Sequence, residues 1–420
     1  MLRKHLFEEL IWGGLAALLV WGGWTSRPGW AQAPESAPLR VFILAGQSNM
    51  QGHAQVSTIP AMQWNPQAAP LLKDILGPDG QPRACQRVWI SSLGSSDTEK
   101  IGRLTVGFGA AGKEPKIGPE YTFGIYIEKH LDGPVLIIKT AWGGKSLHTD
   151  FRPPSAGPYE FTPEQLEVLE RRGKDVQQIQ ADRKAASGRF YRLMIDHVRF
   201  VLSDIERVCP QYDPAQGYEL AGFVWFQGWN DMVDSGTYPH RDQPKGFDEY
   251  SRLLGHFIRD VRSDLDCPDL PFVIGVLGVG GPTDRYGPDK QRYKSVHQNF
   301  RDAMAAPADW PEFRGNVVAV RTEAYWDMQV AALRERERAI LPQVNAIRKR
   351  IRAGEIARDE GEQQIAALYD QTFDARELEI LRRSVSNAEY HYLGSAGIMA
   401  QIGKGFADAM VQLMEKRSPR

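Results

Sequence analysis

The chain has 420 residues, 42% of them hydrophobic, which is enough to bury a sizeable core in one large domain or two. Its formal net charge is −1 at pH 7, so no global basic field would attract nucleic acid or an acidic lipid surface. The remaining composition is ordinary for a globular protein, although 11 tryptophans is a high number.

The N-terminus has the layout of a secretory signal peptide. A basic region at 3–4 precedes an apolar segment at about 11–24, and small residues follow up to Ala33. The apolar segment is short for a membrane span, so we expect no stable span in the mature protein. The pattern predicts a signal peptide over 1–33, cleaved after Ala31 or Ala33, and a secreted or periplasmic protein.

Apolar runs of strand length recur at wide intervals after this segment. They span residues 39–44, 88–90, 135–139, 222–226, 272–277 and 317–321. Helical spacing of apolar residues lies between several of them, as at 190–205 and 250–261. Strands that alternate with helices predict an α/β fold, a three-layer α/β/α sandwich with a central parallel sheet.

Long segments rich in proline, glycine and charge separate these elements, at 53–86, 91–120 and 145–188. We interpret them as loops that extend over the active face of the sheet. Residues 328–383 are strongly charged, with apolar residues at helical spacing, which predicts an inserted helical hairpin with a solvated charged face.

Two of the three cysteines occupy similar places in the pattern. Cys209 and Cys267 each follow an amphipathic helical segment and lie shortly before an apolar strand. Neighbouring parallel strands would bring the two preceding loops together. We therefore predict a Cys209–Cys267 disulfide and a free Cys85.

Four separated segments carry residues suited to ester hydrolysis. They are residues 46–50, 141–147 and 227–231, each directly after a predicted strand, and residues 390–394, before the last helix. Loops at the carboxyl ends of adjacent strands converge in a doubly wound sheet, so we expect these segments to form one site.

The four segments supply a candidate for each part of an esterase. A serine hydroxyl needs a base within hydrogen-bond reach, which makes Ser48 the candidate nucleophile and His391 the candidate base. The backbone N–H groups of Ser48 and Gly144 and the side-chain amide of Asn230 are candidate donors for an oxyanion hole. On its own, Ser48 could equally cap a helix that begins near residue 49.

Together the segments resemble the consensus blocks of the SGNH (GDSL-like) hydrolase superfamily. The sequence Gly-x-Asn-Asp at 228–231 is similar to its third block. The Gly-Gln-Ser-Asn-Met start, the Trp-Gly-Gly block and Ile-Gly-Pro-Glu at 117–120 resemble the sialate O-acetylesterase and acetylxylan esterase branch, the SASA-type carbohydrate esterases. The resemblance implies a flavodoxin-like SGNH esterase domain over 38–415, with the helical insertion at about 328–383.

By the family's pattern, Ser48 is the nucleophile, His391 is the base, and Gly144 and Asn230 belong to the oxyanion hole. The chain departs from the pattern three residues before the histidine, where the family has an orienting aspartate and this sequence has Ala388. Losing that acid lowers the rate but leaves residual catalysis in the general triad template.

Several groups could take the place of the missing aspartate. Glu389 or the distant Asp327 could orient the histidine. A backbone carbonyl or Asn387 could do so instead, leaving a Ser–His dyad. A weakened or inactive homologue is the third alternative.

Five further residues are candidates for substrate binding. Gln47 and Gln227 could bind sugar hydroxyls or could tie strand ends together. Trp142 and Trp229 could stack on a sugar ring or could simply pack. Glu120 could pair with a residue of the pocket.

We therefore predict a secreted serine esterase that removes O-acetyl groups from a carbohydrate through an acetyl-enzyme. The substrate is sialic acid or an acetylated polysaccharide such as xylan, and the oligomeric state is open. The sequence has no zinc-ligand spacing, no EF-hand loop and no dinucleotide fingerprint, so we expect no metal or cofactor. The alternatives are a carbohydrate-binding homologue on an esterase scaffold and a general aryl or lipid esterase.

Overall fold

The structure is a computed structural model that describes residues 37–417. The predicted signal peptide over 1–33 lies outside the described residues and stays a prediction. Within 37–417, no helix combines the length and the apolar character that crossing a membrane requires.

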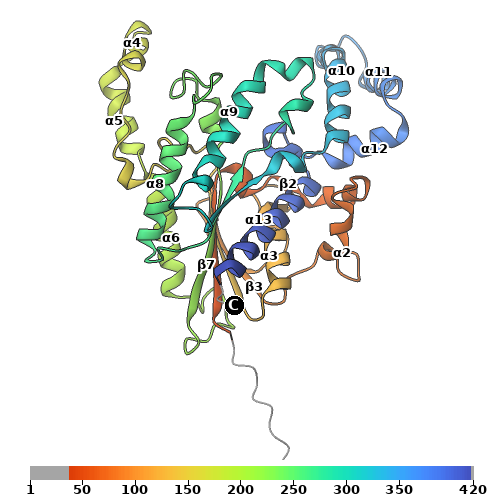
Figure 1. The fold of residues 1–420 in the computed structure, drawn as a ribbon. Coiled ribbons are helices and arrows are strands. Elements are labelled where there is room, and N and C mark those ends of the chain that lie inside the picture. The colour runs from red at the N-terminus through yellow and green to blue at the C-terminus, as the bar shows by residue number, and fades with distance from the viewer. Residues whose placement is uncertain (1–36, 418–420) are drawn as a thin grey trace, which may run out of the picture. The chain divides into compact units, whose positions relative to one another are not determined.

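A seven-stranded sheet forms the centre of the fold, in the order β4-β3-β6-β1-β7-β8-β9 (Figure 1). Its strands are β1 Leu39–Gly46, β3 Val88–Gly94, β4 Lys100–Arg103, β6 Val135–Ala141, β7 Tyr218–Phe226, β8 Phe272–Val276 and β9 Val317–Arg321. All neighbours pair in parallel except the edge strand β4, which is antiparallel to β3. Each predicted apolar run coincides with one of these strands, although the run at 272–277 extends one residue past the end of β8, and the predicted α/β fold is confirmed.

Helices cover both faces of the sheet, as the side chains of β7 show. Trp225 packs 4.2 Å, ring centre to ring centre, from Phe257 of helix α8, Asp248–Asp264. The next residue, Phe226, lies 5.3 Å from Phe406 of helix α13, Ala396–Arg417. Successive strand residues point to opposite faces, so α8 and α13 lie on opposite sides of the sheet (Figure 1).

The longer helices can be grouped by the face or region that they occupy. The α13 side holds α3 Pro119–His130 and α13 Ala396–Arg417, which pack together, and the other side holds α6 Arg189–Ser203, α8 Asp248–Asp264 and α9 Lys294–Ala305. The short helices are α1 Ser48–Gln51, α2 Leu72–Ile75 and α7 Trp229–Val233, and a two-stranded ribbon pairs β2 Ala54–Gln55 with β5 Lys116–Ile117.

The segment predicted as a loop at 145–188 contains two helices, α4 Pro163–Arg171 and α5 Val176–Ala186, which project from the body (Figure 1). The loop prediction is wrong there because neither helix buries a side chain, so neither needs a strong apolar face. Local caps fix their ends instead: Thr162 forms a capping box, and Asp175 accepts from the N–H of Gln178.

The charged insertion has three helices, where the sequence predicted a hairpin of two. They are α10 Met328–Arg352, α11 Arg358–Thr372 and α12 Ala375–Ser384 (Figure 1). A capping box between Asp374 and Glu377 starts α12 only three residues after α11 ends. The hairpin prediction missed this short break inside one continuous helical pattern.

The predicted Cys209–Cys267 disulfide is wrong, because the structure does not join these two residues. The two preceding loops are offset along the sheet. Phe223 of β7 is paired with Phe272 of β8. Cys267 precedes Phe272 by five residues, whereas Cys209 precedes Phe223 by fourteen. Cys209 is also buried in the hydrophobic core, at a turn that follows α6.

Candidate active site

Three adjacent strands end together at the point where the strand order reverses. β1 is central, with β6 and β3 on one side and β7, β8 and β9 on the other. Gly46 at the end of β1 is in register with Ala141 of β6 and with Phe226 of β7. Ligand sites in open α/β sheets form at the carboxyl ends of strands beside such a switch point.

Ser48 begins a one-turn helix at the end of the central strand. A Cβ atom on Gly46 would lie 2.1 Å from the carbonyl oxygen of Phe226, so only glycine lets β1 end this close to β7. As the first helical residue, Ser48 has a backbone N–H with no acceptor inside the helix. Its side chain is only 8% exposed.

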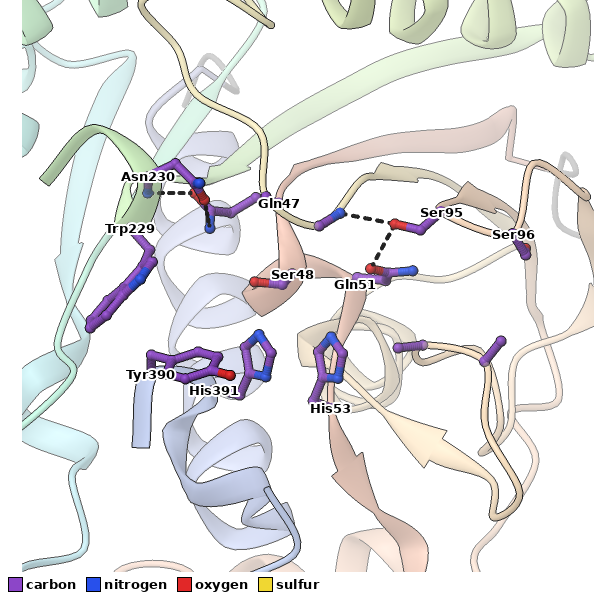
Figure 2. A pocket seen from close by; sticks show the side chains of 14 residues that line it. Gln47, Ser48, Gln51, His53, Ser95, Ser96, Trp229, Asn230, Tyr390 and His391 are labelled. Carbon is purple, nitrogen blue, oxygen red and sulfur yellow. Dashed lines mark hydrogen bonds between the residues drawn. The ribbon is translucent and has the colours of Figure 1, made fainter. Parts of the chain in front are cut away.

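Ser48 borders a cavity of about 500 Å³ that collects residues from distant parts of the chain (Figure 2). The lining residues are Gln47, Ser48, Gln51, His53, Ser95, Ser96, Ala110, Ala111, Gly143, Gly144, Trp229, Asn230, Tyr390 and His391. All four segments singled out in the sequence therefore contribute to one cavity, which we call the catalytic cavity.

The orientation of His391 is set by Asn387. The distance from His391 Nδ1 to Asn387 Oδ1 is 2.9 Å, and the same oxygen accepts the backbone N–H of Ala388. The bond from Ala388 shows that the Asn387 atom facing the ring is the oxygen, which can only accept a hydrogen bond. His391 Nδ1 must therefore be the donor and carry the proton. The lone pair of the neutral ring is then on Nε2, the nitrogen that is left to take a proton.

Neither carboxylate proposed as the orienting group contacts His391. Glu389 forms ion pairs with Lys290 and Arg338. Asp327 caps α10 by accepting the N–H of Val330 at 3.0 Å and also accepts from Asn65. The alternative in which Asn387 orients the ring is the one that the structure contains.

A strained turn presents His391 to the cavity. The next two residues, Tyr392 and Leu393, have φ values of +51° and +61°, in the left-handed region that side chains rarely adopt. The fully buried hydroxyl of Tyr392 holds this turn, at 2.7 Å from both the N–H of Gly278 and the hydroxyl of Thr322. Strain that is held by surrounding bonds in this way is common at functional sites.

A second histidine stacks on His391 (Figure 2). The rings of His53 and His391 are 3.9 Å apart and only 4° from parallel. Burial and the nearby Lys116 ammonium lower the pKa of His391 to about 4. Burial, His391 and the Lys116 and Lys139 ammonium groups lower the pKa of His53 to about 3. Both rings are therefore neutral at pH 7, as a general base must be.

Three hydrogen-bond donors line the catalytic cavity near Ser48. Asn230 Oδ1 accepts from Gln47 Nε2 at 3.1 Å, which leaves the amide nitrogen of Asn230 available. Gly144 has φ +73°, and the N–H of its neighbour Gly143 is taken by Ser95 Oγ at 3.0 Å. In the described part of the chain, no protein acceptor engages Asn230 Nδ2 or the N–H of Ser48 or Gly144.

Two predicted substrate-binding residues are buried away from the cavity. Trp142 is 3% exposed and packs on Phe151 and Phe190. Gln227 is 2% exposed and donates to Lys145 O and to Asp231. These contacts are those that the packing and strand-tying alternatives describe, and neither residue lines the catalytic cavity.

The other two polar or aromatic candidates beside the strand ends do line the cavity. Trp229 is half-buried there. Gln47 is almost fully buried, and both ends of its amide are engaged, by Asn230 and by the N–H of Gly228. Gln47 therefore positions the neighbouring strand ends, and Trp229 is the aromatic surface that a ligand can reach.

Glu120 lies beneath the cavity rather than in it. Its carboxylate accepts from Lys139 Nζ at 2.8 Å and from the N–H of Gly118, and both members of the ion pair are fully buried. Lys139 also donates to the carbonyls of Gln51 and Phe108. Burial lowers the pKa of Lys139, and the Glu120 carboxylate opposes that shift.

We expect Glu120→Gln to destabilise the protein by about 3–5 kcal/mol, because it leaves the Lys139 ammonium buried without a counter-charge. Urea unfolding followed by circular dichroism measures this change. Glu312→Gln, which breaks an exposed ion pair with Arg259, is the control and should cost less than about 1 kcal/mol. Equal losses in the two variants would contradict a structural role for the buried pair.

Sequence reasoning missed the contribution of the loop after β3. Ser95 accepts from Gly143 and donates to Gln51, so it fixes the glycine loop against α1. The predicted run at 88–90 ended four residues before the strand does. A longer strand would have placed Ser95 at the same edge as the other site residues.

Comparisons with known proteins identify the family to which the chain belongs. A model of the family described as carbohydrate esterase, sialic acid-specific acetylesterase, matches residues 38–314. No curated protein sequence matches the chain.

Three solved structures are similar over part of the chain. A protein from Arabidopsis thaliana is 18% identical over 68% of this chain and 86% of its own, with a TM-score of 0.36. A carbohydrate acetylesterase from Xanthomonas citri is 15% identical over 64% and 48%, with a TM-score of 0.33. NanS is 13% identical over 68% and 79%, with a TM-score of 0.37.

Proposed function

Because the chain belongs to the sialic acid-specific acetylesterase family of carbohydrate esterases, and is thus a carboxylic ester hydrolase acting on carbohydrate acetyl groups, we propose that Ser48 and His391 perform the hydrolysis. One observation carries this proposal. Ser48 and a neutral, oriented His391 come from opposite ends of the chain and border the same cavity, together with three available N–H donors.

The proposed reaction has two halves. His391 Nε2 takes the proton of Ser48 Oγ as that oxygen attacks the acetyl carbonyl carbon. The N–H groups of Ser48 and Gly144 and the amide of Asn230 hold the oxyanion. The sugar alcohol leaves with the proton from His391, and an acetyl-enzyme remains. His391 then takes a proton from water as the water oxygen attacks the acetyl carbon. It returns this proton to Ser48 Oγ when the bond from that oxygen to the acetyl carbon breaks, and acetic acid leaves and ionises to acetate.

The missing aspartate changes how the imidazolium is stabilised. Asn387 fixes the tautomer and the ring angle, but its neutral amide supplies no charge. In our proposal the neutral ring of His53, which stacks on His391 at 3.9 Å, stabilises the imidazolium that forms through a cation–π interaction. In this proposal the amide of Asn387 orients the imidazole of His391, and stacking with His53 stabilises its protonated form.

This arrangement has a consequence for the pH profile. His391 must be neutral to act as a base, so we expect kcat/KM to fall as the pH drops through its pKa of about 4. Asn387→Asp places a carboxylate at Nδ1, which favours the imidazolium, raises this pKa and moves the acid limb up by about 1–3 pH units.

Acetate release measured from pH 3 to 8 tests that shift. Asn387→Ala is the matched control, because it removes the orienting oxygen without adding charge and should lower the rate without raising the limb. If the acid limb of the Asn387→Asp pH profile stays at the wild-type pH, residue 387 does not contact the catalytic base.

A substrate panel tests the proposed activity and identifies the sugar. It comprises O-acetylated sialic acid, acetylated xylan, 4-nitrophenyl acetate and a long-chain 4-nitrophenyl ester. Acetate release from either carbohydrate supports the proposal. Glycan affinity without acetate release would favour the binding-protein alternative, and faster cleavage of the long-chain ester would favour a lipid esterase.

We also propose that the protein is exported, on the pattern of residues 1–33. Sequencing the N-terminus of protein recovered outside the cytoplasm tests this point. A start at residue 32 or 34 supports export with cleavage of a signal peptide. Protein found only in the cytoplasm, with Met1 intact, would contradict the proposal.

A further inference from the structure

A second cavity lies beside the catalytic cavity and shares a wall with it. It has a volume of about 940 Å³ and lies between α7, the segment at 279–297, which includes the start of α9, and the start of the charged insertion. Trp229 and Tyr390 line both cavities, with ring centres 5.6 Å apart. These two residues directly precede Asn230 and His391. A bound oligosaccharide that lies over Trp229 and Tyr390 therefore also lies close to the proposed catalytic groups.

The wall and rim of this second cavity offer aromatic surface. Tyr390 is 45% exposed and Tyr293 is 42% exposed, and both line the second cavity. Exposed aromatic rings of this kind stack on the apolar faces of sugar rings. Tyr390 in particular offers such a surface next to Trp229.

The charge of the second cavity is opposite in sign to that of the whole chain. Arg241, Lys290, Arg292 and Arg338 line it, against only two carboxylates, Asp289 and Glu389. One of these, Glu389, pairs with two of the cations, Lys290 and Arg338, and so offsets one of their two positive charges.

The other two arginines have no carboxylate partner in the described part of the chain. Arg241 donates to the carbonyls of Met232 and Val233, at 3.1 and 2.9 Å. Arg292 lies over the ring of Tyr293, 4.6 Å from its centre. A guanidinium group with open donors binds carboxylates and sulfates more strongly than neutral hydroxyls.

We propose that this second cavity is a subsite for an acidic sugar unit that neighbours the acetylated unit, so that the preferred substrate is an acetylated acidic oligosaccharide. The inference rests on the proposed function, since it assumes that the acetyl ester lies at Ser48. The acid group is a carboxylate, as in a uronic acid, or a sulfate ester. Trp229 and Tyr390 separate the two subsites, and Arg292 and Arg241 face the acid group.

Arg292→Gln tests the subsite with little risk to folding, because this residue is exposed and, within residues 37–417, its side chain forms no hydrogen bond or ion pair besides its contact with the ring of Tyr293. We expect kcat/KM for an acetylated uronic acid oligosaccharide to fall about tenfold. The value for 4-nitrophenyl acetate, too small to reach the second cavity, should stay unchanged, and that for acetylated neutral xylan should change less than twofold. Arg171→Gln, at an exposed position on α4, is the matched control and should leave all three values unchanged.

Calorimetry with the Ser48→Ala variant separates failure of the subsite from failure of the esterase mechanism. This variant should bind a deacetylated uronic acid oligosaccharide about tenfold more tightly than a neutral one, and adding Arg292→Gln should remove the difference. A sulfated oligosaccharide in parallel identifies the acid group. Equal binding of acidic and neutral oligosaccharides would overturn the proposal, even if acetate release is normal.

Discussion

Replacing Ser48 with alanine should reduce kcat/KM for 4-nitrophenyl acetate by at least about three orders of magnitude. The variant keeps the N–H donors of the cavity but has no oxygen that can form the acetyl-enzyme. The residual rate should come from binding and the oxyanion donors alone. The small change in volume at a position 8% exposed should leave the free energy of unfolding within about 1 kcal/mol of wild type.

Ser57→Ala is the control for this experiment. Its hydroxyl is exposed and donates to Glu114 outside the catalytic cavity, so the variant should retain wild-type activity. Retention of even a tenth of wild-type kcat/KM by a folded Ser48→Ala variant would exclude Ser48 as the nucleophile.

Replacing His391 with alanine should cause a loss of similar size, about three orders of magnitude, because the serine then has no base to take its proton. Residues that act as one unit are not additive, so Ser48→Ala combined with His391→Ala should be no slower than either single variant. Kinetics of the three variants on 4-nitrophenyl acetate measure this directly.

His130→Ala controls for the loss of a histidine as such. His130 lies at the exposed end of α3, where it contacts the carbonyl of Tyr126, and its removal should not change activity. If the loss of kcat/KM in the double variant equals the product of the two single losses, Ser48 and His391 do not act in one step. His53 would then be the next candidate for the catalytic base.

The parallel sheet and the convergence of the site segments could be predicted from the sequence for a physical reason. Central parallel strands are buried on both faces, so β1, β6 and β7 appear as continuous apolar runs. The residues that follow such runs must meet at one edge of the sheet. This reasoning, together with the family resemblance, located Ser48 and the region around Asn230.

Residues with the same chemistry but different burial could not be distinguished in this way. Trp142 and Trp229 both follow strands, yet one is in the core and the other lines the cavity. Glu120 belongs to a buried ion pair with Lys139, nineteen residues away in the chain. Such differences depend on which helix covers each strand end, and no local pattern encodes that.

The group that orients His391 shows the same limit at closer range. Asn387, Glu389 and Asp327 all offer oxygen atoms, and sequence distance alone does not rank them. The turn that contains Tyr392 and Leu393 adopts positive φ values that their residue types do not favour, and this bend brings Asn387 to the ring. Tertiary bonds from Gly278 and Thr322 impose that conformation.

The most direct test of the central claim is covalent labelling with a fluorophosphonate, which reacts with an activated serine, followed by mass spectrometry of the digested protein. Our account predicts a single labelled peptide in the wild type, modified at Ser48, and slow or absent labelling in His391→Ala. Labelling at another serine instead of Ser48 would contradict it, and so would acetate release that persists after Ser48 is fully modified.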